Sequence, residues 1–119
     1  MNESVARRMR LVVLESPFSA GTPGDIERNL TYARACMKHA IDRGESPLAS
    51  HLLYTQPGIL VDDVPEQRAL GIACGFAWWD VAELIAFYED FGWSKGMDAA
   101  MERALIAGKP FERRSVYRL

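Results

Sequence analysis

Two short turns in the sequence combine serine, glycine and a following helix, a combination that can bind an anion. The later turn, residues 90–97 (Asp-Phe-Gly-Trp-Ser-Lys-Gly-Met), lies between the apolar run 84–88 and a helical pattern. Glycine lets the backbone approach a ligand, serine adds a hydroxyl donor, and a helix N-terminus carries partial positive charge. The earlier turn, residues 16–21, follows the apolar run 11–14 and also precedes a helix. On local spacing alone, an ordinary strand-to-helix connection explains such a turn better than a ligand site does.

The two turns together predict a ligand site, because the carboxyl ends of parallel strands lie at the same edge of a sheet. Open α/β sheets bind ligands at that edge. We expect the backbone N–H groups of Ser94 and Gly96 to face the hydroxyls of Ser16 and Ser19 across a cleft. A phosphate between them would be held by neutral donors and a helix terminus.

The elements that position these turns alternate along the chain. Short apolar runs rich in β-branched residues predict strands, and apolar residues at helical spacing predict helices. Alternating strands and helices predict an α/β three-layer sandwich around a doubly wound parallel sheet of four or five strands. We expect Asp25 to cap the first helix. The predicted strands are 11–15, 46–49, 83–88 and 111–113, and the predicted helices are 25–43, 65–79 and 94–107.

Length and composition limit the classes of function. A chain of 119 residues is expected to form one domain, 1–119, with mobile ends at 1–10 and 115–119. A net charge of −2 argues against nucleic-acid binding, which usually needs a basic face. No apolar run approaches the ~20 residues that a membrane span requires.

The cysteines and the amino terminus indicate a cytoplasmic protein. Cys36 and Cys74 lie in helical patterns among apolar neighbours, as expected for buried thiols in a reducing compartment. The polar start of the chain lacks the apolar segment of a signal peptide. No cysteine and histidine cluster has metal-ligand spacing, so neither a metal nor a cofactor is expected.

Several motifs occur in an order that resembles a known group of proteins. They are Ser-Pro-Phe-Ser at 16–19, Asn29, Pro47, Ser50-His51-Leu52, Glu66, Arg68, Gly71 and Ser94-x-Gly96-Met97. Together they resemble the nucleoside 2-deoxyribosyltransferase-like superfamily, and in particular its small phage and bacterial domains. The resemblance runs from about residue 12 to residue 114.

The resemblance implies a flavodoxin-like fold that holds a nucleoside or nucleotide above the strand ends. Relatives in the superfamily break or exchange N-glycosidic bonds with a Glu nucleophile on the helix after the Ser-x-Gly turn. They act as dimers, and a phage-encoded member would work in the host cytoplasm. The residues implied as phosphate or ribose contacts are Ser16, Ser19, Ser94 and Gly96, with Phe18 against the sugar or base. Met97 closes the second motif and is expected either to contact the ligand or to pack beneath the turn.

One departure from the superfamily pattern affects the expected chemistry. The nucleophilic Glu would lie six residues after Ser94, where this sequence has Ala100. Alanine cannot attack an anomeric carbon or stabilise an oxocarbenium ion. Asp90 is then the leading catalytic acid, although an aspartate that bonds to its own turn explains it equally well. An N-glycosidase and a non-catalytic nucleotide binder both remain as expectations.

Three further residues are expected to support the site. Asn29 is expected to hold the first turn by a hydrogen bond. His51 is a general acid or base contact, or else a structural residue. Arg68 contacts a phosphate, or else pairs with a nearby carboxylate.

Two expectations concern surfaces. The helix 65–79 has two apolar stripes. The stripe expected on the sheet is formed by Leu70, Ala73, Cys74, Ala77 and Trp78. The second is formed by Ile72, Phe76 and Trp79, and it predicts a homodimer or larger even assembly. Arg113 and Arg114 are expected at a solvated strand end.

Overall fold

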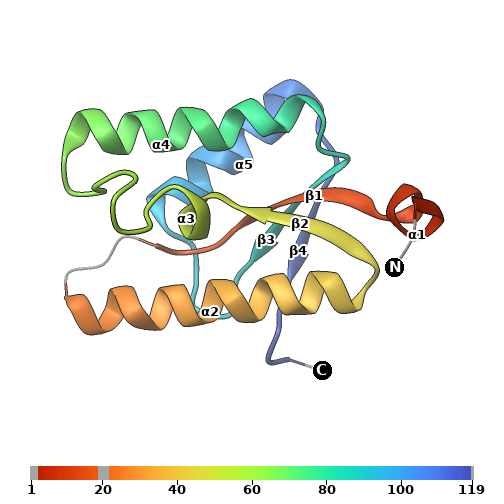
Figure 1. Cartoon of the computed structure of the whole chain (residues 1–119), viewed down its shortest axis with the longest axis horizontal. Coiled ribbons are helices and arrows are strands. Elements are labelled where there is room, and N and C mark those ends of the chain that lie inside the picture. Colours follow the sequence, from red (N-terminus) through yellow and green to blue (C-terminus); the bar gives the residue numbers. More distant parts are fainter. Residues whose placement is uncertain (1–2, 19–21, 119) are drawn as a thin grey trace.

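A four-stranded, all-parallel sheet forms the middle layer of the structure, a computed structural model that describes residues 3–18 and 22–118. The strand order is β2-β1-β3-β4. Helix α2 covers one face, and helices α4 and α5 cover the other (Figure 1). The predicted α/β three-layer sandwich is confirmed. The bounds are β1 (Arg10–Glu15), α2 (Pro23–Asp42), β2 (Glu45–Ala49), α4 (Pro65–Ala77), β3 (Leu84–Tyr88), α5 (Lys95–Ala107) and β4 (Phe111–Arg114).

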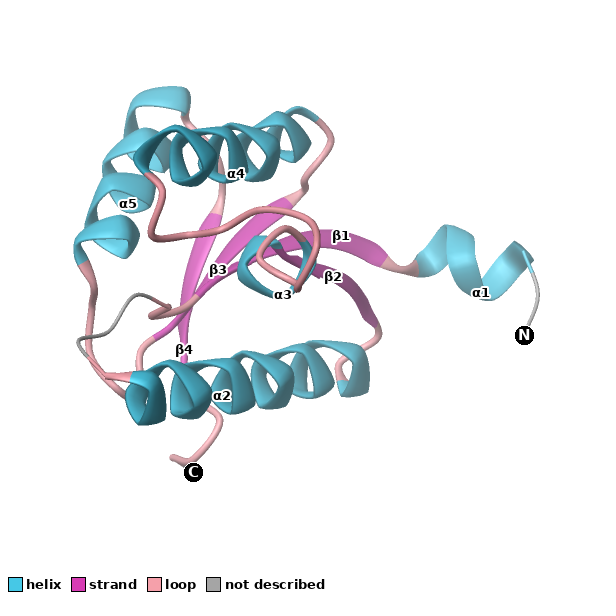
Figure 2. Cartoon of the chain, turned by 60° about the vertical axis from the view of Figure 1, so that its left-hand side comes forward, coloured by secondary structure: helices cyan, strands magenta, loops and turns pink. Residues whose placement is uncertain are grey.

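Three short helical segments were not predicted: α1 (Glu3–Arg8), α3 (Ser50–Leu53) and the 3-10 helix η1 (Trp78–Asp80). Helix α1 projects beyond the sheet at the start of β1 (Figure 2). Each segment is too short to produce a periodic apolar pattern. None of the helices in the described part of the chain has both the length and the apolar character needed to cross a membrane.

Helix α2 begins earlier than its apolar pattern suggests. Thr22, rather than Asp25, is the N-cap, and its hydroxyl accepts a hydrogen bond from the Asp25 backbone N–H at 3.1 Å. Pro23 fits the first helical position because its missing N–H has no role there. Asp25 instead places a negative charge in the first turn, where the helix dipole favours it.

The alternation of side chains along β1 divides the core into two halves. Val12 and Leu14 face α2, where they pack with Tyr32 and Cys36. Val13 faces the opposite way and packs with residues of β3, η1 and α5. Because side chains alternate along a strand, Glu15 continues the row of Val13, on the face that α4 and α5 cover.

Helix α4 is turned differently from the prediction. Leu70 and Trp78 of the stripe expected on the sheet are 55% and 47% exposed. The inward face instead carries Gly75, where an added Cβ would come 3.0 Å from the Ser50 Cβ, and it continues to buried Trp79. A glycine face lets the helix approach α3 closely. Trp79 therefore packs within the chain, and the homodimer stays a prediction that now involves the exposed side of α4.

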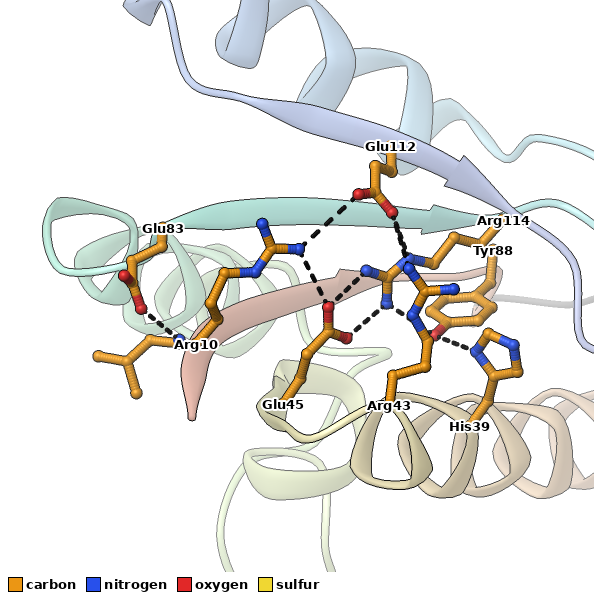
Figure 3. Close-up of polar contacts among 9 residues, drawn as sticks. Arg10, His39, Arg43, Glu45, Glu83, Tyr88, Glu112 and Arg114 are labelled. Atoms are coloured by element: carbon orange, nitrogen blue, oxygen red, sulfur yellow. Dashed lines mark hydrogen bonds and ion pairs between the residues drawn. The ribbon is translucent and has the colours of Figure 1, made fainter. Parts of the chain in front are cut away.

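A buried ion pair crosses the sheet on the α2 face (Figure 3). Arg114 at the end of β4 is 6% exposed and donates two hydrogen bonds, at 2.8 and 2.7 Å, to Glu45 at the start of β2. Arg114 also donates to the Tyr88 hydroxyl at 3.1 Å, and Arg10 donates to Glu45 at 3.2 Å. The expectation that Arg114 is solvated is wrong, because its partner lies 69 residues away in sequence.

The pKa values in this cluster show whether burial or hydrogen bonding has the larger effect on each charged group. Burial alone would raise the pKa of Glu45, but the hydrogen bonds from Arg114 and Arg10 outweigh it and lower that pKa. Burial alone would likewise lower the pKa of Arg114, and its bonds to Glu45 and Tyr88 raise it instead. Both groups are therefore charged at neutral pH, and each depends on the other.

Candidate functional site

A cavity of about 450 Å³ lies at the carboxyl edge of the sheet on the α4 and α5 face. Its walls come from the end of β1, the first turn, α3, α4 and the N-terminus of α5. The volume falls in the range of small-molecule sites. The predicted site residues that line it are Phe18, His51, Arg68, Ser94 and Gly96.

The N-terminus of α5 opens into this cavity. Ser94 is the N-cap, and its hydroxyl oxygen accepts a hydrogen bond from the Met97 N–H at 3.2 Å. Within the described residues, the N–H groups of Lys95 and Gly96 have no acceptor, and both residues line the cavity. Met97 is 1% exposed and packs in the core. The expectation of a ligand contact at Met97 is therefore wrong, because its N–H is used by the cap.

An aromatic pair forms another wall. Phe18 and His51 stack with ring centroids 4.8 Å apart and an interplanar angle of 11°. As expected, Asn29 holds the first turn: its side-chain amide donates to the Phe18 carbonyl at 2.9 Å. Burial lowers the pKa of His51 to about 4, so the imidazole is neutral at pH 7 and offers an uncharged face.

Glu15, which sequence reasoning missed, contributes a carboxyl group to the cavity. It is the last residue of β1, and the described residues supply neither a hydrogen bond nor an ion pair to its carboxyl. The residue is half-buried and borders the cavity. Burial raises the pKa of Glu15 to about 8, so this carboxyl is largely protonated at neutral pH. An acid in the apolar row of a central strand was the available sequence signal.

The charges around the cavity favour an anionic ligand. Lys95 and Arg68 line it, and no ion pair of the described residues involves either cation. Asp62 supplies one negative charge, while Glu15 and His51 are largely neutral at pH 7. The sum is therefore about +1, in a chain whose overall formal charge is −2.

Asp90 lies outside the cavity lining. Its carboxylate accepts hydrogen bonds from the Tyr32 hydroxyl at 2.5 Å and from the Ser115 hydroxyl. It also accepts from the backbone N–H groups of Val116 at 2.8 Å and Tyr117 at 3.2 Å. These bonds hold the carboxyl-terminal segment that the sequence predicts to be mobile. Burial alone would raise the pKa of Asp90, but the hydrogen bonds lower it to about 2. A carboxylate that is ionised, and whose oxygens already accept these hydrogen bonds, has no proton to donate and is not a general acid.

Asp90→Asn is therefore expected to affect stability and not a reaction in the cavity. The amide keeps one acceptor oxygen and loses the charge, so we expect the free energy of unfolding to fall by about 1–3 kcal/mol. Urea denaturation measures this loss. An unchanged unfolding midpoint, together with loss of ligand turnover, would return Asp90 to the catalytic role.

Three other predicted positions lie away from the cavity or outside the described residues. Ser16 is 3% exposed and is not part of the cavity lining. Ser19 lies outside the described residues. Ala100 is 1% exposed and packs in the core, while Ala99 borders the cavity. A carboxylate at position 100 would thus point at the sheet in this arrangement.

In residues 3–18 and 22–118, no cluster of histidine, cysteine and acidic side chains is arranged to hold a metal ion.

Comparisons with known proteins identify the family and leave the activity open. The searches of curated proteins and of solved structures found no match. A family model described as a domain of unknown function, DUF7768, matches residues 10–114 and so spans the sheet and every wall of the cavity. The chain belongs to the DUF7768 family.

Proposed function

We propose that this protein binds a nucleoside 5′-phosphate in the cavity at the carboxyl edge of its sheet. The observation that carries the proposal is the joint presence of two features in one cavity. The N-terminus of α5 presents the N–H groups of Lys95 and Gly96, and the Phe18–His51 stack presents an aromatic wall. The first feature suits a phosphate, and the second suits a base or sugar.

Charge and volume support the same ligand class. Arg68 and Lys95 add positive charge beside the helix terminus, which makes the cavity attractive to an anion. A volume of about 450 Å³ accommodates a ligand of nucleotide size. The resemblance of the motifs at 16–19 and 94–97 to a nucleoside-processing superfamily points the same way.

Gly96 gives a direct test of this site. Gly96 does not have a positive φ, and an added Cβ would lie 3.8 Å from the Ser94 hydroxyl, an ordinary contact. Gly96→Val therefore keeps the backbone unstrained and places its side chain where the phosphate would sit. We expect a tenfold or greater loss of affinity, about 1.4 kcal/mol or more, for the nucleoside 5′-monophosphate that binds best from a panel of AMP, GMP, CMP and UMP.

Calorimetric titration measures these affinities, and Gly24→Val is its matched control. Gly24 is also the second residue of a helix, also lacks a positive φ, and has no atom within 4 Å of an added Cβ. It is not part of the cavity lining. Equal affinities of Gly96→Val, Gly24→Val and the parent would exclude this site.

A second candidate function is hydrolysis of the N-glycosidic bond, and Glu15 is the observation that favours it. A carboxyl that holds its proton at neutral pH can act as a general acid. Glu15 would donate its proton to a ring nitrogen of the base as the C1′–N bond breaks. Water would then form the new C1′–O bond, and the proton that this water releases would reprotonate Glu15.

Incubation of the protein with the same monophosphates separates the two functions. Chromatography detects free base if the bond is hydrolysed and intact nucleotide if the protein only binds. Base release that Glu15→Gln abolishes would support hydrolysis, whereas complete recovery of the nucleotide would support binding alone.

A further inference from the structure

Glu15 and the N-terminus of α5 come from adjacent strands. Glu15 ends β1 and pairs in register with Phe87 of β3. Strand β3 ends one residue later, and the chain turns through Gly92, whose φ of 82° favours glycine, into the Ser94 cap of α5. Glu15 and the helix terminus thus border the same cavity, and the strands that lead to them are neighbours in the sheet.

The two groups differ in what they can donate. The N–H groups of Lys95 and Gly96 are permanent donors, whereas a carboxyl donates only while it holds its proton. A deprotonated Glu15 would place a negative charge beside the phosphate and repel it. A protonated Glu15 would remove that charge and add a hydrogen bond.

We propose that Glu15 makes binding at this site proton-dependent, because its protonated carboxyl donates a hydrogen bond to an anionic oxygen of the ligand. The inference rests on the proposed phosphate site and extends it. The ligand is then a phosphate whose affinity falls as the pH rises above neutrality. An uncharged nucleoside would lack this response.

The other titratable groups at the cavity do not account for this pH dependence of binding. His51 on α3, with its pKa near 4, stays neutral throughout the range from pH 7 to 9.5. Arg68 on α4, Lys95 on α5, Asp62 and Tyr54 are the remaining titratable groups of the cavity. Glu15→Gln keeps all four of these groups, so a difference in pH slope between the parent and this variant reports Glu15 alone. A phosphate monoester is already dianionic at the start of the range.

The test is the affinity for AMP, and for adenosine as the uncharged probe, measured by calorimetry between pH 7 and 9.5. With the pKa of Glu15 near 8, the protonated fraction falls about 30-fold over this range, and the affinity for AMP should fall with it. At pH 8, titrations in two buffers of different ionisation enthalpy should show uptake of about 0.5 proton per AMP. Glu15→Gln, which keeps a donor and cannot ionise, should lose both the pH slope and the proton uptake.

Glu102→Gln is the control, because Glu102 is an exposed carboxylate on α5 outside the cavity lining. It should keep the pH slope of the parent. AMP binding without a slope, or a slope that Glu15→Gln retains, would overturn the role of Glu15 and leave the phosphate site standing. If AMP does not bind, the same titrations are made with the monophosphate of the panel that binds best. If none of the four binds to the parent at any pH, the proposed function fails, and the inference fails with it.

Discussion

Arg114→Met is expected to reduce the free energy of unfolding by about 3–5 kcal/mol, because it leaves Glu45 buried without its main partner. The side chains of Arg114 and Glu45 are only 4% and 5% exposed. Water therefore cannot replace the lost hydrogen bonds. A domain of this size has a total stability of about 5–15 kcal/mol, so the loss would be a large part of it. Guanidinium denaturation at pH 7, followed by circular dichroism, measures the effect.

Two further variants separate the stability lost by breaking the ion pair from the stability lost by removing any arginine. Arg113→Met removes the neighbouring arginine, whose exposed pair with Glu89 should contribute little. The double variant Glu45→Gln/Arg114→Met removes both charges and should recover part of the stability, because no uncompensated charge remains. A double variant as unstable as Arg114→Met would show that the loss comes from packing rather than from charge.

The parent protein is expected to lose stability relative to Glu15→Gln as the pH rises. The pKa of Glu15 is about 8 in the folded chain and near its ordinary value of 4.5 in the unfolded chain. The folded state therefore binds this proton more tightly. The stabilisation is complete below about pH 4.5 and disappears as the pH rises through about 8. The change amounts to about 2–5 kcal/mol, the upper figure being the full shift.

The difference in unfolding free energy between the parent and Glu15→Gln isolates this group from the other titrating residues. In parallel urea titrations between pH 5 and 9, we expect the stability of Glu15→Gln relative to the parent to rise up to about pH 8 and to level off above it. A constant difference across that range would mean that Glu15 has an ordinary pKa, and its proposed roles as a proton donor would fall.

The fold could be predicted from the sequence because its signals are local. The apolar run 84–88 is buried throughout as β3. The glycine at position 108 ends α5 with a φ of 67°, a left-handed conformation that favours glycine. Alternating strands and helices permit few other arrangements, because crossovers between parallel strands are right-handed. Ser94 as a helix cap follows from the same local chemistry.

The candidate site could be predicted only where it depends on such local geometry. The α5 terminus and the hydrogen bond from Asn29 to the first turn are of this kind. The roles of acidic side chains depend on partners distant in sequence. Asp90 is engaged by residues 115–117 and by Tyr32, 58 positions away, whereas Glu15 reaches the cavity with no such partner among the described residues.

The sequence by itself thus determined the order of the elements, the parallel sheet and the sheet edge at which the candidate cavity lies. Only the tertiary structure decided which charges are buried, as the contrast between Arg113 and Arg114 shows: adjacent in sequence, one is exposed and the other lies against Glu45. It likewise decided that α4 turns its glycines inward. Burial and pairing depend on what other strands and helices bring to a residue, and local periodicity carries no information about those neighbours.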